Sequence, residues 1–215
     1  MRKYIAFLAV LALPLFMPAT ASALPICGGG TDVTTYNPDG CAFNGVTLSE
    51  FSVVDAGNPG VELVNAVSAF LVNGIVNFEF NPNLATDGIT QDIHFFFKVT
   101  GNLFGVDLFN GGTGDTSISE VVCSGPFSGT QCTGTTLATM NASSQQAKES
   151  YFSPVGTAYV YKDIFKGLGV DEINLSPGHL TSFTQSFHVP EPGSVMLFGL
   201  ALFGCAEVVR RRRLA

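Results

Sequence analysis

Apolar and polar residues alternate along several stretches of the chain. The clearest is Asp92–Val99, in which Ile, Phe, Phe and Val occupy every second position. Similar alternation occurs in Gly74–Phe80, Thr157–Lys162, Ile173–Ser176 and Leu180–Phe187. A period of two sends successive side chains to opposite faces of a strand, so each of these stretches is predicted to be a β-strand.

Turn-forming residues separate the alternating stretches. Clusters of Gly, Pro and Asn lie at Asp55–Gly60, Asn81–Asn83, Asp87–Gly88, Gly101–Asn102, Asn110–Gly114 and Ser176–Gly178. Short strands with such punctuation predict an all-β fold, an antiparallel β-sandwich that is jelly-roll-like or Ig-like. The sheet is expected to begin within Gly45–Asp55, after an entry loop at Leu24–Asn44. The polar segment Asn141–Ser150 is expected to form a loop or one short helix.

The first 23 residues are typical of an export signal. Arg2 and Lys3 precede an apolar run at Ile5–Phe16, and the segment ends in small residues at Ala21–Ala23. This order of charge, apolar core and small-residue site is the one that a signal peptidase recognises. Because Pro14 and Pro18 interrupt the run, it is too short for a membrane anchor. Cleavage is expected after Ala23.

Charge narrows the possible partners of the mature segment, Leu24–His188. This segment has four lysines and no arginine, against 15 Asp and Glu residues. Phosphate contacts need clustered basic side chains, so nucleic-acid binding is excluded from the expected functions.

Four cysteines lie in the mature segment. They form two locally spaced pairs, Cys27 with Cys41 and Cys123 with Cys132. Four cysteines allow three pairings, and the local one is favoured because each bond would close a short, turn-rich loop in an oxidising compartment. A zinc site is the alternative, but C-x-x-C spacing and a nearby His are both missing.

The C-terminal residues have three parts in order. Pro190-Glu191-Pro192 cannot continue a strand ladder, Ser194–Val209 is a short apolar helix candidate, and Arg210, Arg211, Arg212 and Arg213 form a basic cluster. Such a cluster stays on the cytoplasmic side of a membrane. The apolar stretch is short for a permanent span, which favours a transient anchor.

This arrangement resembles the PEP-CTERM sorting domain of Gram-negative bacteria, over about 25 residues. The resemblance implies recognition of Pro190, Glu191 and Pro192 by an exosortase, a membrane-embedded cysteine protease, as substrate residues. It also implies transient anchoring in the inner membrane, then delivery to the cell surface or extracellular matrix. The expected organisation is a signal peptide at 1–23, an extracellular β-sandwich domain at 24–188, and a sorting segment with a transmembrane helix at 189–213.

Candidate catalytic chemistry is sparse in the mature segment. His94, His179 and His188 match none of the usual hydrolase, zincin or phosphate-loop motifs. The chain is therefore expected not to be an enzyme, and a hydrolase assembled in space is the least favoured alternative.

Two binding functions remain open. Asp107, Asn110 and Asp115 flank a Gly-rich turn and offer the oxygen ligands that Ca²⁺ prefers, although a polar hairpin turn is the simpler interpretation. Tyr159 and Tyr161 share a strand face and could form a small platform for a glycan such as an exopolysaccharide, although such a pair more often serves sheet packing. No cofactor is otherwise expected. The leading hypothesis is a non-catalytic surface or matrix component, with a calcium- or glycan-binding module as the alternative.

Overall fold

The computed structural model describes residues 23–56, 63–84, 89–168 and 177–190. Within these ranges the chain forms twelve strands and one short 3₁₀ helix, η1 (Val33–Tyr36). The strands are β1 (Thr31–Asp32), β2 (Cys41–Phe43), β3 (Val46–Asp55), β4 (Asn65–Val72), β5 (Ile75–Asn81), β6 (Gln91–Asn110), β7 (Thr116–Cys123), β8 (Phe127–Ser128), β9 (Gln131–Cys132), β10 (Thr136–Ser143), β11 (Ala147–Lys166) and β12 (Phe183–His188). The predicted all-β class is confirmed.

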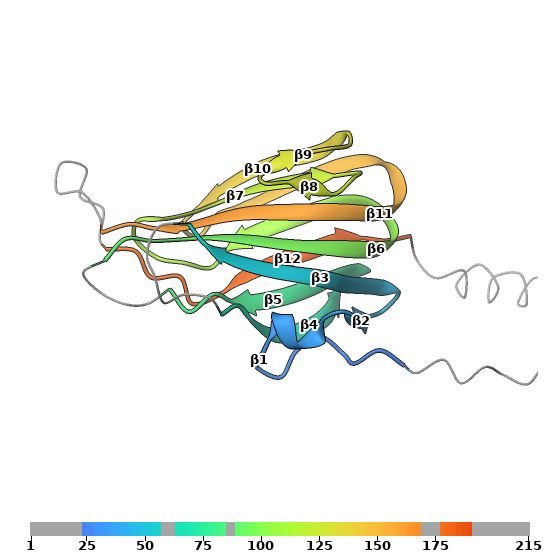
Figure 1. Ribbon diagram of the computed structural model, residues 1–215, viewed down its shortest axis with the longest axis horizontal. Coiled ribbons are helices and arrows are strands. Elements are labelled where there is room, and N and C mark those ends of the chain that lie inside the picture. Colours follow the sequence, from blue (N-terminus) through green and yellow to red (C-terminus); the bar gives the residue numbers. More distant parts are fainter. Residues whose placement is uncertain (1–22, 57–62, 85–88, 169–176, 191–215) are drawn as a thin grey trace, which may run out of the picture.

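Two strands of 20 residues, β6 and β11, bend back at one end of the molecule, so that each contributes one half to each of the two layers (Figure 1). The first half of β6 and the second half of β11 join β2, β3, β7 and β10 in one layer, here called the front sheet. Their other halves join β12, β5, β4 and β1 in the back sheet. Every pairing is antiparallel, so the expected antiparallel sandwich is confirmed.

The prediction of a turn at Gly101–Asn102 is wrong, because β6 continues through both residues. This is where the strand passes from the front sheet to the back sheet. Opposite it, the register of β11 shifts between Tyr151 and Thr157, and Pro154 in that stretch has no N–H to offer a ladder. Bends and bulges of this kind let one strand serve two packed sheets. The Gly–Asn pair therefore does not separate two strands, but it marks the bend at which β6 turns back over itself: Phe95 and Phe97 pack on the partners of Asn110 and Val106.

Phenylalanine rings from both sheets form the centre of the core. Phe80 of β5 packs edge-on against Phe95 of β6, with ring centroids 5.5 Å apart, and lies 5.4 Å from Phe183 of β12. Phe97 meets Phe187 across the same interface. All five side chains are buried. Interdigitation of rings from facing sheets is the packing expected of a sandwich.

A charged network crosses this apolar core. Lys162 of β11 donates hydrogen bonds to Glu120 of β7 and to Gln185 of β12, and all three residues are fully buried. Desolvation raises the pKa of Glu120 and lowers that of Lys162, and the attraction between the two groups opposes both shifts. The ammonium group thus links the front sheet to the back sheet from inside the sandwich.

The two predicted disulfides are present. Cys27 and Cys41 tie together the entry segment, which contains β1, η1 and β2 and is not the plain loop that was expected. Cys123 and Cys132 close a loop that contains the small β8–β9 hairpin, in agreement with the predicted hairpin loop.

The other predicted boundaries have mixed outcomes. The sheet includes β3 at Val46–Asp55, as expected. Asn141–Ser150 is neither a loop nor a helix: β10 and β11 occupy most of it and meet in a tight turn at residues 144–146. The alternating segment Ile173–Ser176, the signal peptide apart from Ala23, and residues 191–215 lie outside the described residues. In the part of the chain that is described, no helix is long and apolar enough to cross a membrane.

Candidate functional site

The outward face of the front sheet carries an unusual row of aromatic side chains. The alternation that buries Phe95 and Phe97 turns Phe96 to the opposite face, where it stacks on Tyr161 of β11 with ring centroids 4.9 Å apart. The residues Tyr161 and Phe96 are direct cross-strand partners. Because a β-pair holds such side chains in fixed register, the two rings form a rigid platform.

The β8–β9 hairpin folds over this platform. Phe127 of β8 lies 5.8 Å from the ring of Tyr161 and 6.0 Å from that of Phe96. This cover buries Tyr161, and desolvation raises the pKa of its phenol to about 12. The bond between Cys123 and Cys132 anchors both ends of the hairpin to the sheet. The disulfide therefore positions an aromatic wall above the face of the sheet.

A groove of about 460 Å³ lies beside this wall. Its lining includes six side chains from four strands, namely Glu50, His94, Phe96, Lys98, Phe127 and Tyr159. The volume falls in the range of small-ligand sites, which are concave and largely apolar with a few polar groups. We call this feature the front groove.

An ion pair closes one end of the front groove. Lys98 Nζ lies 2.8 Å from Glu50 Oε1 and 5.9 Å from the centre of the Tyr159 ring. Glu50 has a left-handed backbone conformation (φ 55°) at the bulge where β3 slips its register against β6. The next residue, Phe51, turns inward, and its backbone N–H and C=O are both bound by the side chain of Asn37. The entry segment thereby holds the bulge that aims Glu50 at Lys98.

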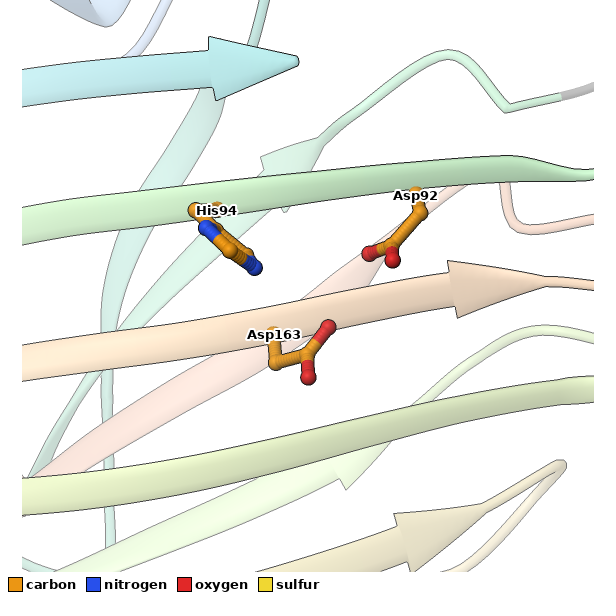
Figure 2. A group of neighbouring side chains, drawn as sticks. All are labelled: Asp92, His94 and Asp163. Carbon is orange, nitrogen blue, oxygen red and sulfur yellow. The ribbon is translucent and has the colours of Figure 1, made fainter. Parts of the chain in front are cut away.

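Three potential metal ligands adjoin the same face (Figure 2). Asp92 and His94 project from β6 on the same side, and Asp163 of β11 is the direct cross-strand partner of His94. One donor atom from each residue lies within 4.8 Å of the others. Burial, together with the neighbouring Asp163 carboxylate, raises the pKa of Asp92 to about 6. His94 lines the front groove as well, so the cluster and the groove are continuous.

The three calcium candidates of the sequence each have other contacts in the structure. Asp107 Oδ1 lies 2.8 Å from His188 Nε2, across from β6 to β12. The side chain of Asn110 is buried, accepts from the N–H of Gly112 and donates to the C=O of Ala142. Asp115 follows the turn, and its C=O accepts from the N–H of Gly167. No ion is needed to explain the Asn110 contacts, and calcium binding there stays a prediction.

Sequence reasoning found parts of this face and missed others. Tyr159 lines the front groove as a platform would require, whereas Tyr161 lies beneath Phe127 and serves as packing. The roles of Phe127 and Glu50 depend on a hairpin fold-over and a bulge that the sequence does not show. The Asp92–His94–Asp163 cluster could have been predicted in part. Asp92 and His94 occupy the polar positions of an alternating strand, and Asp163 lies on the same face of β11 as the two tyrosines.

Comparisons with known structures and sequences give weak likenesses for the domain. TmCBM61 in complex with β-1,4-galactotriose aligns with 65% of this chain and 86% of its own, at 11% identity and a TM-score of 0.35. A structure titled "CBM4 structure and function" aligns with 67% and 85%, at 13% identity and a TM-score of 0.26. Curated protein sequences yield no match. Likenesses this distant carry no argument about the function of the chain.

The C-terminal segment, in contrast, has a specific match. Strand β12 ends at His188, and Pro190 is exposed immediately after it. The PEP-CTERM protein-sorting motif matches residues 188–213, beginning at that strand end. The match includes Pro190, Glu191, Pro192 and the arginine cluster. The chain therefore carries a PEP-CTERM protein-sorting motif, which implies processing by an exosortase.

Proposed function

We propose that the chain is an exported surface or matrix protein whose β-sandwich binds polysaccharide in the front groove. The observation that carries the proposal is the aromatic groove itself, with Phe96, Phe127 and Tyr159 beside the polar pair of Glu50 and Lys98. Sugar rings present apolar C–H faces that stack on aromatic side chains, and hydroxyl groups that hydrogen-bond to charged ones. The groove offers both kinds of contact within one small volume.

Binding without turnover fits the lining better than hydrolysis does. Glycoside hydrolysis ordinarily needs two carboxyl groups on either side of the scissile bond. Among the described residues that line the front groove, Glu50 is the single carboxylate, and it is paired with Lys98. Asp92 and Asp163 adjoin the groove through His94, but they are gathered in one cluster outside its lining. We therefore propose that the domain is not an enzyme.

Replacement of Phe127 by alanine is expected to reduce binding in the front groove by about tenfold. An aromatic contact of this kind contributes about 0.5–1.5 kcal/mol beyond its buried area, and truncation also lowers the groove wall. Isothermal titration of the full chain with a β-glucan, an α-glucan and a polyuronate measures the effect. Tyr151→Ala is the matched control, because Tyr151 is exposed in the other half of β11, outside the groove lining. Absence of binding to every polysaccharide, or equal losses in both variants, would reject the groove as a glycan site.

Delivery of this domain is proposed to follow the order of its signals. A signal peptidase removes residues 1–23, and the C-terminal helix then holds the chain transiently in the inner membrane with Arg210–Arg213 on the cytoplasmic side. The exosortase acts at Pro190–Pro192. The structure supports access to this segment, because His188 is the last residue of β12 and Pro190 is already exposed.

Substitution of both Pro190 and Glu191 by alanine is expected to block processing. The enzyme is proposed to read these side chains directly, so the variant should accumulate as the longer, membrane-associated form. Intact-mass analysis of the exported protein tests this: the native chain should lack residues 193–215, whereas the variant should retain them. Thr181→Ala, an exposed change before β12, should be processed normally. Retention of residues 193–215 by the native chain would contradict the proposed removal.

A further inference from the structure

Asp92, His94 and Asp163 have the placement of a small metal site. The antiparallel register sets His94 directly opposite Asp163, and Asp92 lies two residues before His94 on the same face of β6. The three side chains point toward one another between the two strands, as Figure 2 shows. One donor atom of each lies within 4.8 Å of the other two. Two adjacent long strands, paired over most of their length, hold these positions rigidly.

One oxygen of this cluster is buried without a partner. Asp92 Oδ1 is shielded from solvent, yet it accepts no hydrogen bond from any described residue. A buried carboxylate oxygen without a donor is costly, so such an atom calls for an explanation. Lys98 and Lys162 of the same two strands do not donate to this oxygen, because Lys98 pairs with Glu50, and Lys162 pairs with Glu120 on the opposite face. A cation between the two carboxylates would satisfy the oxygen and relieve their mutual repulsion.

We propose that Asp92, His94 and Asp163 bind one divalent transition-metal ion, such as Zn²⁺, at the edge of the front groove. Imidazole together with carboxylates suits such an ion, whereas Ca²⁺ prefers a shell made of oxygen alone. In a tetrahedral shell with bonds of about 2.0–2.2 Å, ligand atoms lie about 3.3–3.6 Å apart. The donor atoms here lie within 4.8 Å of one another, so side-chain rotations without any change in strand register can bring them around one ion.

Three protein ligands would leave part of the coordination shell open. In zinc proteins, three protein ligands with an open fourth position hold a water molecule or an exogenous ligand. His94 also lines the front groove, so an ion bound to it would lie at the groove edge. The metal site itself stands on the ligand geometry and does not depend on whether the groove binds polysaccharide.

Titration of the metal-free full chain with ZnCl₂ and CoCl₂ tests the proposal. Calorimetry should find one Zn²⁺ per chain, and Co²⁺ should give the visible absorption of a site with a nitrogen ligand. His94→Gln and Asp163→Asn should each weaken Zn²⁺ binding by at least about tenfold, the loss that follows from removing even an outer-shell partner. His179→Gln is the matched control, because it removes a histidine outside the cluster.

Two further measurements test the site without relying on the variants. The ring resonances of His94 in the unaltered chain should shift on Zn²⁺ addition, which requires no variant to fold. CaCl₂ added at the same concentration should bind more weakly than ZnCl₂. Failure of Zn²⁺ to bind, full binding by His94→Gln, or tighter binding of Ca²⁺ would overturn the proposal. Metal binding without polysaccharide binding would leave this site standing while rejecting the proposed groove function.

Discussion

Replacement of Lys162 by methionine is expected to lower the free energy of unfolding by about 3–5 kcal/mol. The ammonium group of Lys162 is the partner of Glu120 in a fully buried network. Its removal leaves a carboxyl group in the core without a counter-charge, and Gln185 Oε1 without its donor. Methionine has a similar volume, so the loss reports the stranded polar groups more than a cavity. Urea unfolding of the full chain at neutral pH measures the change.

Two comparison variants separate this effect from a general loss of charge. Lys98→Met removes the lysine of an exposed pair, in which the side chains of Lys98 and Glu50 are 28% and 56% exposed, and should cost about 1 kcal/mol or less. The double variant Lys162→Met with Glu120→Leu should recover most of the loss, because apolar side chains replace both charges. A loss of less than about 1 kcal/mol in Lys162→Met alone would mean that Glu120 is neutral and well solvated after the change.

The same lysine shows where sequence patterns succeed and where they mislead. Alternation in Asp92–Val99 predicts a strand correctly, because the two faces of that strand differ strongly in polarity. In β11 the buried face reads Ala158, Val160, Lys162; the alternation predicts the strand correctly, but it gives no sign that the lysine is buried. A charged side chain on a core face is recognisable only from its partners, and Glu120 lies 42 residues away in the sequence.

Features that depend on residues close in sequence were predictable. Each disulfide joins cysteines only 14 or 9 residues apart, so short loop closure favoured the correct pairing without knowledge of the fold. Gly101–Asn102 predicted a turn between two strands, whereas in the structure these residues bend one continuous strand from one sheet to the other. The sequence shows the alternating tyrosines of β11, but it does not show that Phe96 of β6 lies opposite Tyr161.

The front groove depends on contacts that no local pattern encodes. Glu50 reaches Lys98 because a bulge in β3 is held by Asn37, which belongs to the entry segment. Phe127 reaches Tyr161 because a hairpin folds back on its own sheet. The hairpin supplies Phe127 itself, whereas the entry segment holds the bulge in β3 that orients Glu50, and a disulfide lies close in sequence to each of these two segments. The paired-cysteine spacing was therefore the best available signal for where the site would form.

Replacement of both Cys123 and Cys132 by serine is expected to cost about 2.6 kcal/mol of stability and most of the binding in the front groove. The energetic estimate follows from chain entropy for a bond that spans 9 residues. The affinity of the front groove should fall by more than the loss of stability alone predicts. Strands β8 and β9 have two residues each and pair only with each other, so the bond is needed to hold them in place. Without the bond, Phe127 must be ordered at the moment of binding, which lowers affinity.

The other disulfide provides the comparison that isolates this effect. Serine at both Cys27 and Cys41 should cost a similar amount, about 3 kcal/mol, because its loop is only slightly longer. That variant keeps the β8–β9 hairpin anchored, so its affinity for a bound polysaccharide should fall less, measured at a temperature where both variants are folded. Equal affinities in the two serine variants would show that the hairpin is held by its ring contacts alone. A selective loss in the Cys123–Cys132 variant would make that bond the element that builds the groove wall.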